Sequence, residues 1–415
     1  MKESTSTWIS MALLTVYLIV MSTMGCQPTQ IPTQPSPTAP STTETLTPIP
    51  FPIPSLIPSP TSFVFPPPTV VFPPPRDVPV EMFHGPLVEQ VETHHLYQGT
   101  WTTYVPQDWT KQFQHAGEFP DISSITLAND GTLWFATSGG VVSGGVGIYH
   151  FDGKTWEHYI TGNVHSYVEF SSSALAPDGA IWFATLCCGI YRFGGKSWTN
   201  YTMGNGLPEN RIDTITFARD GALWVGTLDT ATSRFDGKSW QYFPAYYGSL
   251  WGPSVGRIFV LPDNSLLFST SINSSIANSA KLVRFDGQQW TNYPTPWTEE
   301  GKYTEDMAAA PNGDLWFATE ASGVYRLSKN TWTHFTTKDG LASDIALNVA
   351  VARDGTVWLG TVGGASRFDG KKWTTFILGN DPCIPGVGPI VAAPDGSVWV
   401  GYYGGIARYL PSDSP

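Results

Sequence analysis

The chain has 415 residues, 41% of them hydrophobic, and a formal net charge of −12, so it is long enough to bury a large core. No cluster of lysine and arginine accompanies this acidity, which argues against nucleic acid and anionic lipid as electrostatic partners. Four cysteines do not make a disulfide framework in a chain of this length.

Residues 1–25 are predicted to be a signal peptide, because residues 9–21 form an apolar run that is shorter than the ~20 residues of a membrane-spanning helix. Gly25-Cys26 follows and resembles the lipobox of bacterial lipoproteins, although Thr23 stands where that motif prefers leucine. The resemblance implies that Cys26 is acylated and that the exported chain is held at a membrane of the cell envelope by lipid alone. Cleavage without lipidation, which gives a secreted protein, is the alternative.

Residues 26–80 begin with this cysteine and are predicted to be a disordered tether rich in Pro, Ser and Thr. About half of the 35 prolines of the chain lie here, and such a composition favours extended backbone and cannot bury enough apolar surface to fold. Residues 81–95 are interpreted as a lead-in, with His94 and His95 in solvent. The folded domain is expected over residues 96–410, followed by a short tail at 411–415.

Two short motifs alternate through residues 96–410. The first is Asp-Gly-x-(aliphatic)-Trp-(apolar)-small-Thr, and the second is Arg-Phe-Asp-Gly-Lys-x-Trp, best seen from Arg234. Both recur at intervals of about 42 residues, and a period of 40–50 residues with four short strands is typical of a β-propeller. The copies of the first motif begin at Asp130, Asp178, Asp220, Asp263, Asn312, Asp354 and Asp395.

Each unit is expected to form four antiparallel strands, A to D, from the axis of the ring outward. In the first unit, residues 125–128 are strand A, residues 133–137 are strand B, and Asn129-Asp130-Gly131 between them is predicted to be a type I′ turn. Large aromatic residues of strands B and D are expected to fill the space between neighbouring blades.

The ends of the repeat array indicate how the ring closes. The seventh unit ends at Tyr409 without a tryptophan-bearing strand D, whereas residues 99–104 match such a strand and precede any strand A. The N-terminal strand is therefore expected to complete the last blade and to remove the exposed sheet edge. The predicted fold is all-β: a seven-bladed β-propeller, closed by the N-terminal strand and preceded by a disordered linker.

The units resemble the two-component regulator propeller repeat, most closely at residues 354–361 and 363–368. This resemblance implies an extracytoplasmic propeller of the kind that forms the sensory half of histidine kinases, often for saccharides. We expect no transmembrane helix after the propeller and no kinase or receiver domain in this chain, so only the binding half of that inference is carried over.

Function is expected on the face formed by the D–A and B–C connections, because these vary in length and content whereas the A–B and C–D turns are short. The predicted ligand-binding residues are aromatic and histidine side chains of these connections, which suit the faces of sugar rings. Packing of the loops against one another is the alternative for each ring. The residues are Trp109, His165, Tyr167, Tyr246, Tyr247, Trp251, Trp297, Tyr303 and Tyr403.

Carboxylates and cysteines fall near the same face. Cys187 and Cys188 are expected to form a vicinal disulfide, to pair with Cys383, or to remain buried thiols. No metal-ligand spacing and no cofactor motif is found in the sequence. The acidic residues, interpreted mainly as solvated groups or loop caps, are Asp121, Glu169, Asp213, Glu299, Glu300, Glu305, Asp306 and Asp344.

These patterns predict a non-catalytic, extracytoplasmic ligand-binding or sensor-like lipoprotein for a glycan or other envelope ligand, with a membrane signalling protein as a candidate partner. One alternative is an enzyme of the streptogramin-lyase type, which residues 177–183 resemble. That resemblance implies a catalytic histidine and a metal-binding acid, for which His165 and Glu169 are the candidates. The other alternative is a scaffold for protein interactions.

Overall fold

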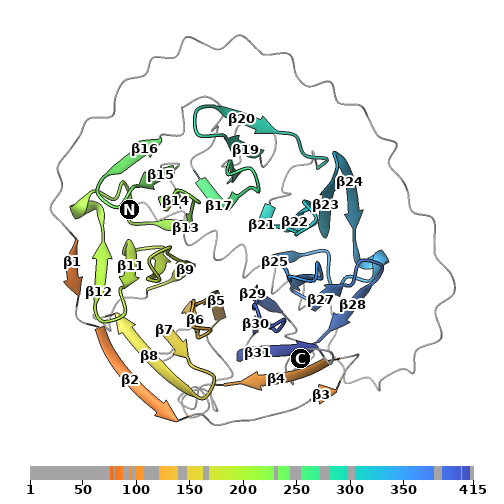
Figure 1. The fold of residues 1–415 in the computed structure, drawn as a ribbon, viewed down its shortest axis with the longest axis horizontal. Helices are drawn as coiled ribbons and strands as arrows, with labels where there is room; N and C mark the ends of the chain where they lie inside the picture. Colours follow the sequence, from red (N-terminus) through yellow and green to blue (C-terminus); the bar gives the residue numbers. More distant parts are fainter. Residues whose placement is uncertain are drawn as a thin grey trace, which may run out of the picture.

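The structure is a computed structural model, and it consists almost entirely of β-strands. The described residues form seven antiparallel sheets that stand around a common axis (Figure 1). The predicted seven-bladed β-propeller is therefore confirmed. The structure describes residues 75–78, 80–86, 94–95, 99–105, 121–138, 147–161, 168–228, 232–243, 254–271, 281–297, 304–377, 386–402 and 404–411.

In blades 1 to 6, strands A to D follow one another in sequence from the axis outward. Blade 1 has β5 (Asp121–Leu127), β6 (Leu133–Ser138), β7 (Ile148–Phe151) and β8 (Thr155–Thr161). Blade 2 has β9 (Phe170–Leu175), β10 (Ile181–Thr185), β11 (Ile190–Phe193) and β12 (Trp198–Tyr201). Blade 3 has β13 (Ile212–Phe217), β14 (Leu223–Thr227), β15 (Thr232–Phe235) and β16 (Trp240–Phe243).

The same order continues around the ring. Blade 4 has β17 (Ser254–Val260), β18 (Leu266–Ser271), β19 (Lys281–Phe285) and β20 (Trp290–Tyr293). Blade 5 has β21 (Thr304–Ala309), β22 (Leu315–Thr319), β23 (Val324–Ser328) and β24 (Thr331–Phe335), and blade 6 has β25 (Ala346–Val351), β26 (Val357–Thr361), β27 (Gly364–Phe368) and β28 (Trp373–Phe376). Two short 3₁₀ helices, η1 (Met203–Asn205) and η2 (Thr337–Asp339), follow β12 and β24.

Blade 7 joins the two ends of the described chain. Its strands are β29 (Val387–Ala392), β30 (Val398–Tyr402), β31 (Gly405–Pro411) and β4 (Gly99–Tyr104). Trp101 lies opposite Tyr409 in this pairing and is only 2% exposed. Its ring also contacts Trp358 of blade 6, at 5.9 Å between centroids, so the N-terminal strand is packed into the core as predicted.

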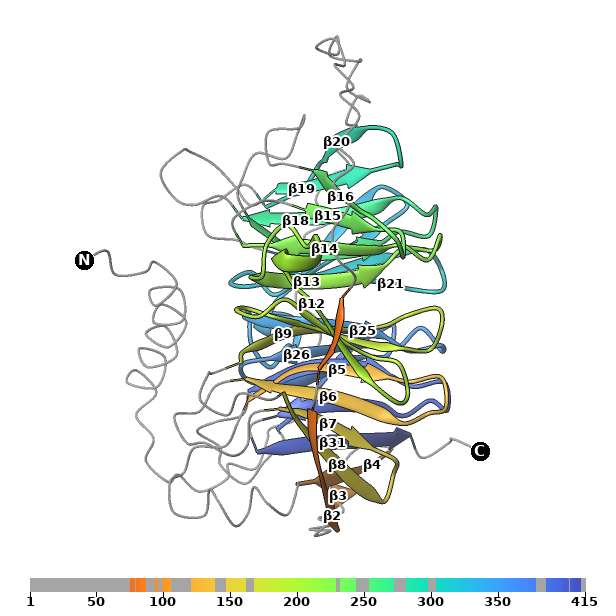
Figure 2. The same ribbon diagram turned by 90° about the vertical axis from the view of Figure 1, so that its left-hand side faces the viewer.

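Three further strands extend the ring outward. β1 (Arg76–Val78) pairs with β12, β2 (Val80–Pro86) with β8, and β3 (His94–His95) with β4, each as a fifth strand on the outside of its blade (Figures 1 and 2). The predicted start of the folded part at residue 96 is therefore wrong, and the tether and the lead-in contribute strands. Strand addition at an open sheet edge needs only backbone hydrogen bonds. A segment without a clear hydrophobic pattern can still form these bonds.

The A–B turns differ from the predicted type I′ geometry. In blade 1, Gly131 N donates to Ala128 O at 3.1 Å, and Gly131 has a φ of +84° while Asp130 is not among the residues with positive φ. The turn therefore places only its glycine in the left-handed region, as in a three-residue hairpin with a glycine bulge. Two adjacent positive φ values, as type I′ requires, occur at Lys329 and Asn330 in the C–D turn of blade 5.

The core lies between neighbouring blades rather than within one. Trp224 of β14 is 2% exposed and packs against Phe243 of its own blade and Phe268 of blade 4, at centroid distances of 5.2 and 5.6 Å. Equivalent clusters of buried aromatic and aliphatic side chains join the other blades. Burial of these rings between sheets is what holds the ring of blades together.

Ring closure can be tested by comparing two tryptophans at the same motif position. Trp101→Ala should lower the free energy of unfolding by about 3–5 kcal/mol, because it empties a buried position between blades 6 and 7. Trp240→Ala in blade 3 is the control, since Trp240 is half-buried and stacks mainly on Phe235, so a loss of about 1–2 kcal/mol is expected. Equal losses in chemical denaturation would contradict the closing role of β4.

Candidate functional site

Each strand A carries a β-bulge near its start, at the end of the blade that the D–A and B–C connections share. In blade 3, Ile212 pairs with Thr227 and Thr214 with Gly226, so Asp213 has no partner in the register. Bulges re-aim side chains and often adjoin functional sites. The residues at this position are Ser123, Ser171, Asp213, Gly256, Glu305 and Leu347 in blades 1 to 6, and Gly388 with Pro389 in blade 7.

At three adjacent blades a charged residue stands at this position, at the next one, or at both. We call Asp213, Arg257, Glu305 and Asp306 the axial charge cluster, because they lie on the innermost strands β13, β17 and β21 (Figure 1). Arg257 Nη1 lies 3.9 Å from Asp213 Oδ1, and the two side chains are 31% and 26% exposed. The cluster therefore has three carboxyl groups and one guanidinium within reach of solvent.

The backbone holds one member of the cluster in place. Asp306 Oδ1 accepts a hydrogen bond from Met307 N at 2.9 Å, and Oδ2 accepts one from Val349 N of blade 6 at 3.0 Å. Gly256 leaves room beside the cluster, since a Cβ there would lie 3.6 Å from Asp213 Oδ2. A fixed carboxylate beside two partly exposed ones is a geometry that can accept hydrogen bonds from a ligand.

The carboxyl groups of the cluster bind protons more tightly than usual. Burial raises the pKa of Asp213 to about 6, against the attraction of Arg257 and with a further rise from the charge of Glu305. Burial also raises the pKa values of Glu305 and Asp306, with Arg257 opposing both shifts. Burial therefore outweighs the attraction of the one guanidinium at all three carboxyl groups. Near pH 6, Asp213 carries its proton for part of the time and can then donate as well as accept a hydrogen bond.

The opposite face behaves differently. Its turn carboxylates are saturated by local bonds: backbone amides of Ser239 and Lys238 lower the pKa of Asp236, and at Asp220 the bonds from Arg234 and the Ala222 amide outweigh burial. Arg234 Nη2 lies 2.9 Å from Asp220 Oδ2. Since these groups cap the turns, the face with the axial charge cluster is the better candidate for binding.

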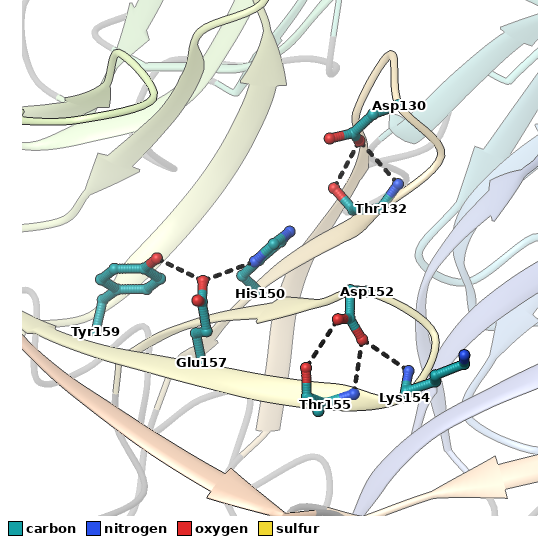
Figure 3. Close-up of polar contacts among 8 residues, drawn as sticks. All are labelled: Asp130, Thr132, His150, Asp152, Lys154, Thr155, Glu157 and Tyr159. Atoms are coloured by element: carbon teal, nitrogen blue, oxygen red, sulfur yellow. Dashed lines mark hydrogen bonds and ion pairs between the residues drawn. The ribbon is translucent and has the colours of Figure 1, made fainter.

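Blade 1 replaces this arginine pairing with a histidine network (Figure 3). His150 stands at the register position of the arginines, opposite Trp134, and its Nδ1 lies 2.9 Å from Glu157 Oε2. Tyr159 OH donates to the same oxygen at 2.7 Å, while Asp130 binds Thr132 of its own turn. These hydrogen bonds join residues of blade 1 to one another, so they give no indication of a ligand-binding site there.

The B–C turn of blade 2 contains a disulfide between Cys187 and Cys188, with a Cα–Cα distance of 3.7 Å. Of the three alternatives for these cysteines, the vicinal disulfide is the one found, and Cys383 lies outside the described residues. Gly189 N, next to the disulfide, donates to Asn210 O at 2.9 Å, three residues before Asp213. The disulfide thus lies on the same face as the axial charge cluster.

Of the nine predicted ligand-binding residues, one lies in the part of the chain that the structure describes. Trp297 is described, and it is 4% exposed, packed against Tyr325 and Trp332 at centroid distances of 4.8 and 5.6 Å. Its assignment to a stacking surface is therefore wrong, because the ring fills the core of blade 5. The residues that lie outside the described part are Trp109, His165, Tyr167, Tyr246, Tyr247, Trp251, Tyr303 and Tyr403, together with Cys26.

The predicted acidic residues have different environments. Asp213, Glu305 and Asp306 gather in the axial charge cluster, whereas Asp344 caps a turn by accepting from Thr337 N at 2.6 Å, as expected for a loop cap. Asp121 is exposed at the start of β5. Glu299 and Glu300 lie outside the described residues. The backbone carbonyl of Glu169 accepts a hydrogen bond from Leu186 N at 2.8 Å.

Sequence reasoning missed Arg257, although a signal was present. The bulged residue lies seven positions before the first residue of each Asp-Gly motif, and Arg257 lies six positions before Asp263. The same offset gives Asp306 from Asn312. Aligning the seven units on that motif would have placed a single arginine among acidic and neutral residues on the inner strands.

Within the described residues, no group of three or more His, Cys, Asp or Glu side chains is arranged to hold a metal ion. The helices of the described part are too short and too polar for any of them to cross a membrane.

Comparison with known proteins supports the repeat assignment. Residues 206–229 match the family model described as "Two component regulator propeller". The repeat predicted from the sequence is confirmed. No curated protein matches the chain in sequence.

Solved structures of the same fold come from proteins with different roles. The extracellular domain assigned to the hybrid two component system BT3049 of B. thetaiotaomicron has 19% identity and a TM-score of 0.55, over 71% of this chain and 40% of that one. A streptogramin B lyase has 16% identity and a TM-score of 0.56, over 70% and 94%. PorZ, a surface component of the type-IX secretion system of Porphyromonas gingivalis, has 16% identity and a TM-score of 0.56, over 70% and 46%.

These comparisons show the fold alone, because every identity is low. The two component system domain is extracellular, and this chain spans less than half of its length. The streptogramin B lyase is covered almost completely, yet at an identity no higher than that of the surface component. Choice among these roles therefore depends on the residues of this chain.

The raised pKa of Asp213 predicts a specific pH dependence. The folded protein holds the Asp213 proton more tightly than the unfolded chain, so this carboxyl adds stability as the pH falls from above 6 toward the ordinary value of 3.8. Asp213→Asn should remove that gain. From about pH 8 to about pH 4, the variant should lose about 1–2 kcal/mol relative to the wild type, less than the full shift implies because Asp213 is 26% exposed.

The matched control is Asp220→Asn on the opposite face. Because the pKa of Asp220 is lowered, its contribution is lost only below the ordinary value of 3.8, and the difference from the wild type should stay constant over that range. Denaturant unfolding at several pH values measures both. A constant difference for Asp213→Asn as well would show that its carboxyl titrates normally.

Proposed function

We propose that the protein is a non-catalytic, extracytoplasmic propeller that binds a neutral, polyhydroxylated ligand such as a glycan over the axial charge cluster. The observation that carries this proposal is the grouping of Asp213, Arg257 and Glu305 on adjacent innermost strands, with side chains that remain within reach of solvent. Carboxylates accept hydrogen bonds from hydroxyl groups, and a guanidinium donates to their oxygens.

The charge of the cluster narrows the ligand class. Three carboxyl groups beside one guanidinium, on a chain of net charge −12, disfavour anionic polysaccharides. Neutral hydroxyl groups suffer no such repulsion and can bond to both signs of charge. The aromatic residues predicted in the neighbouring connections would add stacking surfaces for sugar rings.

An enzyme of the streptogramin-lyase type is the weaker candidate. Among the described residues, histidines lie on β2, β3, β7, β8 and β24, which are third, fourth or added outer strands. None of these strands carries the axial charge cluster, so a histidine base would have to come from outside the described part, as His165 would. A protein-interaction scaffold has no specific observation in its favour.

The location proposed for the protein is the cell envelope, with the chain anchored by an acylated Cys26 and the propeller outside the cytoplasm. This proposal rests on the apolar run at residues 9–21 and the Gly25-Cys26 pair. A membrane signalling protein is proposed to bind the propeller and respond to its ligand. The reason is the resemblance of the chain to the propeller repeat of two-component regulators.

Binding can be tested with an array of neutral, amino and anionic glycans and the full chain. We expect binding to neutral glycans, and Glu305→Gln should weaken it about tenfold, since it removes a charged acceptor worth about 1.5 kcal/mol. Asp220→Asn is the control and should bind like the wild type, because it lies on the opposite face. Selective binding of anionic glycans, or equal affinity of Glu305→Gln and the wild type, would contradict the proposed site.

Anchoring is tested independently at Cys26. The wild type should partition with membranes and show a diacylated N-terminal cysteine by mass spectrometry, whereas Cys26→Ser should lack this form. An unmodified mature N-terminus beyond residue 26 would overturn the lipoprotein assignment and favour secretion.

A further inference from the structure

The vicinal disulfide of blade 2 closes a turn that the fold forms without it. Thr185 Oγ1 donates to Gly189 O at 2.8 Å and accepts from Cys188 N at 2.9 Å, and Thr185 N also donates to Gly189 O at 3.1 Å. Gly189 has a φ of +82°, and a Cβ there would collide with Tyr201 O. These bonds and the glycine define the path of the turn.

Blade 5 has the same turn with other residues in place of the cysteines. Thr319 Oγ1 donates to Gly323 O at 2.9 Å and accepts from Ser322 N at 3.2 Å, and Thr319 N donates to Gly323 O at 3.1 Å. Gly323 has a φ of +68°. Ala321 and Ser322 stand where blade 2 has Cys187 and Cys188, so the turn needs no covalent bond.

The disulfide also contributes little by constraining the unfolded chain. The stabilisation that a disulfide gives through chain entropy grows with the length of the loop that it closes, and adjacent residues close the shortest loop of all. The disulfide is therefore explained neither by a need to hold the turn nor by stabilisation through the entropy of the unfolded chain.

The two cysteine residues differ in their exposure to solvent. Cys187 is exposed, whereas Cys188 is half-buried and packs against the core cluster shared by blades 1 and 2. An incoming thiolate can therefore reach Cys187, and the sulfur that leaves belongs to Cys188. Accessibility of one sulfur and ordering of the other are the requirements for directed thiol–disulfide exchange.

We propose that Cys187–Cys188 is a redox-reversible thiol–disulfide exchange site on the face that carries the axial charge cluster. A thiolate attacks Cys187 Sγ, the Sγ–Sγ bond breaks, and Cys188 leaves as a thiolate that takes a proton from water. The second thiol of a dithiol reductant then attacks the reductant's own sulfur in the mixed disulfide, and Cys187 leaves as a thiolate that is protonated in turn. Two electrons and two protons pass to the protein, which holds two thiols, and the reductant becomes a cyclic disulfide.

The test compares the native full chain with and without millimolar dithiothreitol, followed by alkylation and peptide mass spectrometry across residues 187–188. We expect both cysteines to be alkylated after reduction under native conditions, and the disulfide to return with oxidised glutathione. The melting temperature should change by less than about 2 °C, since the turn is independent of the disulfide. A disulfide that resists reduction until the protein unfolds would overturn the proposal.

Two variants control for a structural role. Cys187→Ala/Cys188→Ser copies the blade 5 turn and should melt within about 2 °C of the wild type. Ala321→Cys/Ser322→Cys transfers the pair to blade 5 and should form a vicinal disulfide there. A large loss of melting temperature in the first variant would show that the disulfide stabilises the fold and would contradict the exchange role.

A further arm identifies the source of the thiol. Reduced thioredoxin, a protein dithiol, and dithiothreitol, a small one, are supplied separately at equal reducing capacity. Reduction by both indicates a site open to protein partners, and reduction by dithiothreitol alone indicates a site for small thiols. Failure of both would overturn the proposal, whatever the outcome of the glycan array.

Discussion

The backbone pairing of β31 with β4 is the constraint on which the rest of the ring depends. Without it, blade 7 would end at β31 and expose a full row of unpaired amides and carbonyls. The pairing also brings Trp101 into contact with Trp358 of blade 6, so closure of the sheet and packing between blades occur together. Once the ring is closed, the seven innermost strands are held at fixed positions around one axis.

That fixed scaffold separates the residues that must repeat from those that can vary. The motif tryptophans are constrained by packing, and the Asp-Gly turns are constrained by the left-handed glycine and the Asp side chain that caps the turn. The bulged position of strand A has neither constraint, because its side chain is outside both the ladder and the core between blades. It holds Ser, Asp, Gly, Glu or Leu in different blades, and its variation gives the axis its local chemistry.

Sequence reasoning succeeded where a local pattern controls the structure. The motif repeat predicted the blades, and the unpaired tryptophan strand at residues 99–104 predicted closure. Sequence reasoning failed where contacts between distant segments determine the structure. β1 and β2 form by addition to open sheet edges, which requires little hydrophobic periodicity in the added segment. Trp297 looked like a loop aromatic because it follows strand D, but the space beside Tyr325 and Trp332 buries it.

Only part of the candidate site could be predicted from the sequence. Carboxylates near the D–A face could be named, but which of them meet depends on the bulge, which turns adjacent strand residues toward a common axis. Arg257 could have been found by alignment on the Asp-Gly motif, whereas the raised pKa of Asp213 could not, since it depends on burial in the folded ring and on the charges of Arg257 and Glu305 from other blades.

Charged side chains are paired differently on the two faces of the propeller. This difference favours the face with the axial charge cluster for binding. On the Asp-Gly face, Asp220 is joined to Arg234 within its own blade, so each charge is satisfied locally and a ligand would have to break existing bonds. At the axial charge cluster, Arg257 is shared among Asp213, Glu305 and Asp306 from neighbouring blades, and no partner fully compensates the others. A ligand that supplied hydrogen-bond donors there would offset the cost of burying these carboxyl groups.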